Sequence, residues 1–286
     1  MTLEDDLARL ERQVLGIRRV SSFLDAVEAI RRLLDTAPLE VRARVLAMTA
    51  PTLGGDLAAA VLAAFDLGVG AGTKAAGIDD PGDPAPRELA AAARAAQRDL
   101  TKLVGQARTL ARGGAEPAVL LSPLLGAAAA TKRNVTTLVN RAGNEGVVTA
   151  ATAAKLELVW VAETNACVHC LAYSGRTVVA GKPWPKGLSY AGSNPYDAPG
   201  KCPPLHANCR CTLEVLNDQS YADALRREAD RSVLRGFSLE SESMRVRVNA
   251  AERLLADGVD APKSVIAYAS RSVRAGKFET RGRPVR

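Results

Sequence analysis

Every cysteine and histidine of this chain falls inside one short window of the sequence. The chain has 286 residues but only five cysteines and two histidines. All seven lie between residues 167 and 211: Cys167, His169, Cys170, Cys202, His206, Cys209 and Cys211. Random placement would rarely gather them so closely. Because thiolates and imidazoles act as metal ligands and as catalytic groups, the window is expected to form a site.

The spacing inside this window favours a structural zinc site. Cys167-x-x-Cys170 places two thiols on one tight turn, and this spacing suits a tetrahedral metal. A second set of ligands follows as His206-x-x-Cys209-x-Cys211, just before an apolar run. Two ligand clusters on two loops are the sequence pattern of a zinc module. Zinc would stabilise these loops directly, because the free energy of metal binding becomes folding free energy.

Structural zinc takes four ligands, and the window offers more than four. We expect Cys167 and Cys170 to bind the metal together with two of the three candidates that follow: His206, Cys209 and Cys211. Two residues lie outside the closest spacing and are less favoured: His169 and Cys202. The alternative is a set of buried thiols in a domain that binds no metal.

The same residues admit catalytic alternatives, which the sequence disfavours. A thiol protease would need a cysteine beside a histidine base, for which Cys209 and His169 are one pairing. A serine protease would depend on the same two histidines. A zinc deaminase needs Glu two residues after its histidine, and neither His169 nor His206 has one there. We therefore expect a protein that is not an enzyme, with a protease as the alternative.

The chain before the window is expected to be helical. Apolar residues recur at the three-to-four spacing of an amphipathic helix along residues 3–34 and 87–112. The helices predicted up to residue 155 are 3–34, 39–50, 57–67, 87–112, 117–142 and 145–155, with a break at Gly143 and Asn144. The glycine-rich segment 68–74 lacks the Gly-Lys-Ser/Thr order of a phosphate loop. We interpret this segment as a flexible joint.

Short β-branched and aromatic runs in the window predict strands. The strands are expected at 156–161, 177–179 and 211–216, and further helices at 219–235, 240–256 and 262–275. The expected fold is α+β and predominantly α-helical, with long helical arms around a small zinc-stapled module that contains β-strands. Four regions follow: an N-terminal helical arm at 1–80, a helical region at 87–155, the Cys/His module at 156–216, and C-terminal helices with a basic tail at 217–286.

Composition and charge narrow the class of protein. Hydrophobic residues make up 47% and charged residues 24% of the chain, as in ordinary folded proteins. The net charge is +7, and residues 221–286 carry 14 Lys and Arg against nine Asp and Glu. This excess favours nucleic acid or an acidic protein as a partner, or forms a solvated helical surface. The chain opens without a secretory signal pattern, and its apolar stretch at 118–131 is too short to span a bilayer. We expect a protein of the reducing cytoplasm without a membrane partner.

The motifs of the window resemble those of a known family. Val159-Trp160-Val161-Ala162 leads to Cys167-x-x-Cys170, then to Ser174-Gly175-Arg176, then to Pro203-Pro204-Leu205-His206-Ala207-Asn208-Cys209-Arg210-Cys211. This pattern, over residues 130–216, resembles the phage Mu F-like head morphogenesis family, the minor capsid proteins of tailed bacteriophages. The matching positions are Cys167, Cys170, Gly175, His206, Cys209, Arg210 and Cys211. The chain departs from the family at two positions, since Asn165 stands where the family often has Asp and Cys202 is an additional thiol.

The resemblance implies a structural minor capsid protein that binds the portal inside the head, near the portal vertex, and assists head assembly or the packaging and delivery of DNA. Its partners would be the portal protein, the major capsid or scaffolding protein, and packaged DNA through the C-terminal basic region, with assembly in the host cytoplasm. The alternatives are a capsid maturation protease and a zinc-containing DNA-binding protein of the virion. Arg210, between two ligand cysteines, is expected to offset thiolate charge or to hydrogen-bond a carbonyl.

Overall fold

The computed structural model describes residues 57–79, 85–115, 117–163, 166–184, 202–206, 209–234, 244–256, 258 and 260–278. The helices predicted at 3–34 and 39–50 lie outside these residues. The described chain is mainly helical with one small sheet, which confirms the predicted α+β class. Contacts divide it into two compact units, the first formed by residues 57–64 and 85–139 and the second by residues 65–79 and the described chain from 140 onward.

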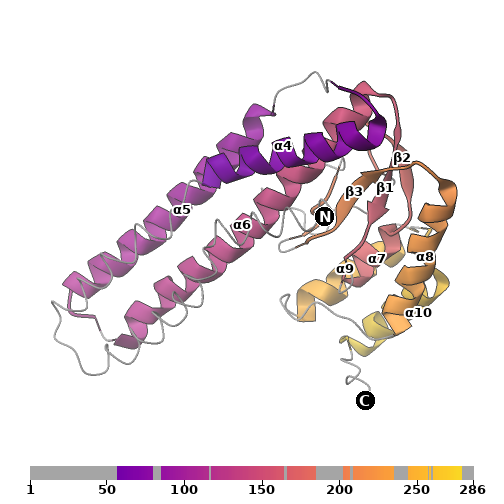
Figure 1. Ribbon diagram of the computed structural model, residues 1–286. Helices are drawn as coiled ribbons and strands as arrows, with labels where there is room; N and C mark the ends of the chain where they lie inside the picture. The colour runs from indigo at the N-terminus through magenta and orange to yellow at the C-terminus, as the bar shows by residue number, and fades with distance from the viewer. Residues whose placement is uncertain are drawn as a thin grey trace, which may run out of the picture. The chain divides into compact units, whose positions relative to one another are not determined.

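Helices precede and follow a short β-containing stretch (Figure 1). In chain order the elements are α4 (Leu57–Ala76), α5 (Arg87–Arg112), α6 (Pro117–Ala153), β1 (Glu157–Val161), α7 (Val168–Tyr173), β2 (Thr177–Val179), β3 (Thr212–Val215), α8 (Gln219–Leu234), α9 (Met244–Ala256) and α10 (Lys263–Ala275). The three strands and the C-terminal helices begin and end within a few residues of the predicted positions. Only the short helix α7 was not expected, because its sequence is too brief to show a helical period.

In the first unit, α5 and the first part of α6 run side by side as a helical hairpin (Figure 1). The chain turns at Gly113 and Gly114, where Gly114 adopts a φ of 71° and the Gly113 N–H donates a hydrogen bond to the Thr109 carbonyl (3.1 Å). Part of the predicted apolar stripe of α5 is buried, as Leu89, Ala93, Ala96 and Ala107 show.

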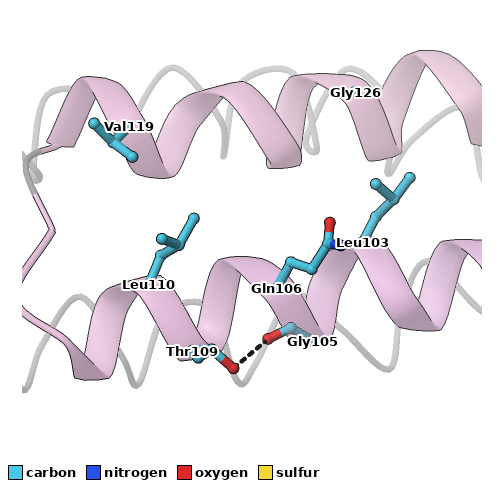
Figure 2. A pocket seen from close by; sticks show the side chains of 7 residues that line it. All are labelled: Leu103, Gly105, Gln106, Thr109, Leu110, Val119 and Gly126. Carbon is cyan, nitrogen blue, oxygen red and sulfur yellow. Dashed lines mark hydrogen bonds between the residues drawn. The ribbon is translucent and has the colours of Figure 1, made fainter.

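Toward the turn of the hairpin, the two helices line a shallow, open apolar groove of about 1100 Å³. Figure 2 shows Leu103, Gln106 and Leu110 of α5 on the side that faces Val119 and Gly126 of α6. A Cβ atom at Gly126 would meet nothing within 4 Å. Leu103 and Leu110 of the α5 stripe therefore border the groove, whereas Ala107 between them is fully buried.

The second unit is built on a three-stranded antiparallel sheet of order β2-β1-β3. The central strand β1 pairs Leu158 with Val178 of β2 on one side and with Val215 of β3 on the other. Trp160, on the same strand, is fully buried. Its ring centroid lies 5.5 Å from that of Tyr173 and 5.3 Å from that of Trp184. Helix α10 packs against α7, α8 and α9 and completes this core.

The prediction of a flexible joint at 68–74 is wrong, because this segment is the second half of helix α4. Its glycines allow α4 to lie against α6 at very short range. A Cβ atom at Gly68 would lie 1.9 Å from the Gly143 carbonyl oxygen, and one at Gly146 would lie 2.2 Å from the Phe65 carbonyl oxygen. A glycine inside a helix lowers helix stability by about 1 kcal/mol relative to alanine. At this crossing the close contact between the two backbones explains why glycines are present.

The predicted break at Gly143 and Asn144 is also wrong, since α6 is continuous through both residues. Gly143 is at the contact with α4. Asn144 is fully buried, and its side-chain amide donates to the Asn140 carbonyl one turn earlier (2.9 Å). A Gly-Asn pair commonly ends a helix, but here tertiary contacts hold both residues inside one.

Helix α4 also has the length and composition of a membrane-crossing segment. Residues 59–76 have a mean hydropathy of 1.2, and 33% of this window is buried. The same apolar, glycine-containing face packs on α6 within the second unit. The contact with α6 therefore accounts for the small residues on that face of the helix.

Candidate metal centre

The first two cysteines of the cluster are positioned by helix α7. Cys167 is the residue that caps its N-terminus, and the Cys167 Sγ accepts a hydrogen bond from the Cys170 backbone N–H (3.4 Å). An N-cap side chain satisfies one of the amide donors that a helix start leaves without a partner. Cys167 and Cys170 are both buried. The predicted tight turn is thus the first turn of a helix, and it brings both thiols to the same place.

The later donors lie on the chain that leads into β3. The Cys209 N–H donates to the His206 carbonyl (3.1 Å), which closes a turn between these two residues. Cys211 immediately precedes β3. His206, Cys209 and Cys211 are all 2% exposed or less. The three residues of the second ligand set are therefore all buried.

The structure gathers all five predicted ligands into two overlapping groups that share Cys170. In each group every donor atom lies within 4.8 Å of the others: Cys167 with Cys170 and His206, and Cys170 with Cys209 and Cys211. The His206 Nε2 lies 3.3 Å from the Cys167 Sγ and 3.4 Å from the Cys170 Sγ. The Cys170 Sγ lies 3.8 Å from the Cys209 Sγ.

These separations are close to the edges of a zinc tetrahedron. With bonds of about 2.3 Å to sulfur and 2.0–2.1 Å to nitrogen, an ideal tetrahedron has S···S edges of about 3.8 Å and S···N edges of about 3.6 Å. Four thiols and an imidazole are also donors that bind zinc in preference to magnesium or calcium, because those two ions favour oxygen ligands. The cluster therefore fits a thiophilic divalent metal in both spacing and chemistry.

The four thiols hold their protons unequally. Burial opposes ionisation of Cys167, but hydrogen bonds with Cys170 and His206 lower its pKa well below the usual value. Burial is likewise outweighed at Cys209 by hydrogen bonds with Cys170 and Cys211, so its pKa is also lowered. The hydrogen bond with Cys167 raises the pKa of Cys170 well above the usual value. At Cys211 the hydrogen bond with Cys170 lowers the pKa. The hydrogen bond with Cys209 and burial outweigh that effect, so the pKa of Cys211 lies well above its usual value. Since thiolates are the ligand form, a bound metal would displace the remaining protons.

Two buried asparagines of α6, which lie outside the Cys/His window, contact this segment. The Asn140 and Asn144 side-chain amides both donate to the Cys211 carbonyl, at 3.0 and 3.1 Å. The Asn144 Oδ1 accepts a hydrogen bond from the Leu213 N–H (2.6 Å). The available signal was their spacing, because two asparagines four residues apart on one helix share a face.

Arg210 points away from the cluster although both of its neighbours are buried. Its side chain is 55% exposed, and its Nε lies 3.9 Å from the Glu163 Oε2. Alternation of side chains along an extended segment accounts for this direction. The ion pair is half-exposed on the arginine side, and such pairs contribute little to stability. The expected role of Arg210 beside the thiolates stays a prediction.

His169 and Cys202 are buried but belong to neither donor group. The His169 ring lies beside Tyr173, with centroids 6.1 Å apart. The His206 ring contacts the Cys167 and Cys170 thiols. These positions agree with the prediction that the two residues are the less favoured ligands.

Gly175 is required by backbone geometry at the turn between α7 and β2. Its φ is 71°, a conformation that residues with a side chain rarely adopt. A Cβ atom there would lie 2.2 Å from the Ala222 carbonyl oxygen and 2.9 Å from the Arg226 backbone nitrogen, both in α8. The family-like position is thus explained by the close approach of α8.

Replacement of Gly175 by alanine is therefore expected to lower the free energy of unfolding by about 3 kcal/mol, from positive-φ strain combined with overpacking. Gly114→Ala is the matched control, because Gly114 has the same φ of 71° but nothing within 4 Å of its Cβ position. The control should lose only about 1 kcal/mol. Urea unfolding curves would measure both, and equal losses would contradict the role assigned to the α8 contact.

Comparisons with models of known protein families, with curated proteins and with solved structures gave no match. The site is therefore defined by its own geometry. In the part of the chain that the structure describes, five buried donors from two separate segments form two groups that share Cys170, and either group is able to hold a metal ion.

Proposed function

We propose that the cluster binds one Zn²⁺ through four of its five donors and that this metal holds the fold together. The observation that supports this proposal is the burial of every donor in two groups that share Cys170. A catalytic zinc keeps a ligand position open for water or substrate, whereas this cluster offers more protein donors than zinc needs. The metal would join α7 to the segment before β3, which are far apart in sequence.

We propose that the chain as a whole is a structural minor capsid protein of the phage Mu F-like type, bound to the portal inside the head. The support is the sequence pattern together with the places of its residues. The matched cysteines and His206 gather in one buried centre, and the matched Gly175 has a packing reason to be glycine. Motif residues that bind a buried metal or permit close packing stabilise the fold, as expected of a structural protein.

The α5–α6 hairpin offers a surface for the portal. Leu103 and Leu110 line the apolar groove, and Val119 at its edge is 49% exposed. A partly open apolar groove has a shape into which a helix of a partner protein can dock. An amphipathic helix of the partner would place two or three apolar side chains in such a groove.

Co-expression with the portal protein of the same genome tests this proposal. The wild-type chain is expected to co-purify with the portal, and Leu103→Glu with Leu110→Glu should weaken the complex at least tenfold by placing charges in the groove. Arg94→Glu is the control, because Arg94 is exposed on α5 and does not line the groove. Absence of a complex both in solution and in assembled heads would refute the portal proposal.

A further inference from the structure

Among the residues that the structure describes, no strand lies beside the outer edge of β3 in the sheet, whose order is β2-β1-β3. The Leu216 N–H donates to the Glu157 carbonyl of β1 (2.8 Å). Backbone groups alternate in direction along a strand, so those of Leu213 and Cys211 point away from β1. Buried groups at such an edge need other partners.

Two asparagines of α6 supply those partners. The Asn144 amide accepts from the Leu213 N–H (2.6 Å) and donates to the Cys211 carbonyl (3.1 Å), which is how one residue of a neighbouring strand would bond. Asn140 adds a second donor to the same carbonyl (3.0 Å). Asn140 is 2% exposed and Asn144 is 0% exposed. Both amides therefore bond to the same short stretch of backbone, and the Asn144 amide also donates to the Asn140 carbonyl one turn earlier.

That stretch carries a candidate ligand. The Cys211 thiol is 1% exposed and lies in one group with the Cys170 and Cys209 thiols. The direction of its side chain depends on its backbone, which the two amides fix from residues 71 and 67 positions away in sequence. Groups that orient metal ligands from behind typically change metal affinity by 10–100-fold.

We propose that Asn140 and Asn144 are positioning residues that hold Cys211 in place as a ligand of the metal. This inference rests on the proposed zinc site. It assigns Cys211 to the ligand set and gives α6 a role in forming the site.

Asn144→Asp is the sharpest variant, because it keeps an oxygen for the Leu213 N–H but replaces the donor to the Cys211 carbonyl with a second oxygen. Titration of the full-length chain with Co²⁺ against a competing chelator should give about 10–100-fold weaker binding than wild type. The thiolate-to-cobalt charge-transfer band, which grows with the number of bound thiolates, should also weaken. Asn134→Asp is the control, since Asn134 is a buried asparagine on the same helix and should leave affinity and band unchanged.

A Cys211→Ser background distinguishes a positioning role of Asn144 from a general effect of Asn144 on protein stability. If Asn144 acts through Cys211, Asn144→Asp should change cobalt affinity by no more than about twofold once Cys211 is already serine. An undiminished effect in that background would overturn the inference, as would wild-type affinity and band in Asn144→Asp itself. If Asn144→Asp does not fold, Asn140→Ala replaces it, with a smaller loss expected because one donor to Cys211 remains. Absence of Co²⁺ and Zn²⁺ binding by the wild-type chain would instead refute the metal site.

Discussion

Replacing Cys170 with serine is expected to weaken metal binding strongly and to destabilise the module around it. Cys170 is the residue that the two donor groups share, and its thiol lies 3.4 Å from the His206 Nε2 and 3.8 Å from the Cys209 Sγ. Its loss breaks both groups, whereas loss of Cys167 or Cys211 leaves the other group complete. We expect metal affinity to fall at least about a hundredfold, which corresponds to about 3 kcal/mol of stability.

Cys202→Ser is the matched control for this experiment. Cys202 is also buried, at 2% exposure, but belongs to neither donor group. It therefore reports the cost of placing a hydroxyl in a buried thiol position without removing a candidate ligand. Zinc content and melting temperature should both be lower for Cys170→Ser than for the wild-type chain. For Cys202→Ser, zinc content should match wild type, and a chelator should lower the melting temperature as it does for wild type. Wild-type zinc content in Cys170→Ser would show that the shared donor is not a ligand.

The second large effect is expected at the contact between α4 and α6. Gly68→Ala should destabilise the chain by about 3 kcal/mol, because the added Cβ would lie 1.9 Å from a backbone oxygen that cannot move independently of α6. For a unit of this size, the melting temperature should fall by roughly 6–12 °C. Nothing in this prediction depends on the metal.

Gly70→Ala serves as its control on the same helix. Gly70 is exposed, and a Cβ atom there would meet nothing within 4 Å. Because alanine favours the helix over glycine, this change should raise stability by about 0.5–1 kcal/mol. The two substitutions are thus expected to have opposite signs. Calorimetric melting curves that move in the same direction by similar amounts would contradict the close crossing of α4 and α6.

Much of this arrangement follows from local sequence. The β-branched run before Cys167 predicts β1 to within one residue, because a strand of this kind needs only its own apolar pattern. The helix predicted at 87–112 is α5. The spacing of Cys167 with Cys170, and of His206 with Cys209 and Cys211, predicts that the members of each set lie close together, and the structure brings the two sets into contact.

The errors occur where distant contacts decide local structure. Segment 68–74 has the composition of a joint, but Gly68 and Gly72 are small because α6 lies against them. The pair Gly143 and Asn144 is typical of a helix end. The Asn144 amide, however, bonds to residues 67 and 69 positions later in the chain, which keeps it inside the helix. A prediction made from neighbouring residues has no access to such partners, so it assigned a joint and a break to what are two continuous helices.

The central claim is that the Cys/His cluster holds one zinc ion, and metal content tests it most directly. Full-length protein, expressed in zinc-containing medium and purified without a metal-affinity tag, would be measured by elemental mass spectrometry. The account predicts about one zinc per chain, retained through gel filtration and lost together with the cooperative melting transition when a strong chelator is added. A folded protein that carries no zinc, and takes up none when Zn²⁺ is supplied, would contradict it.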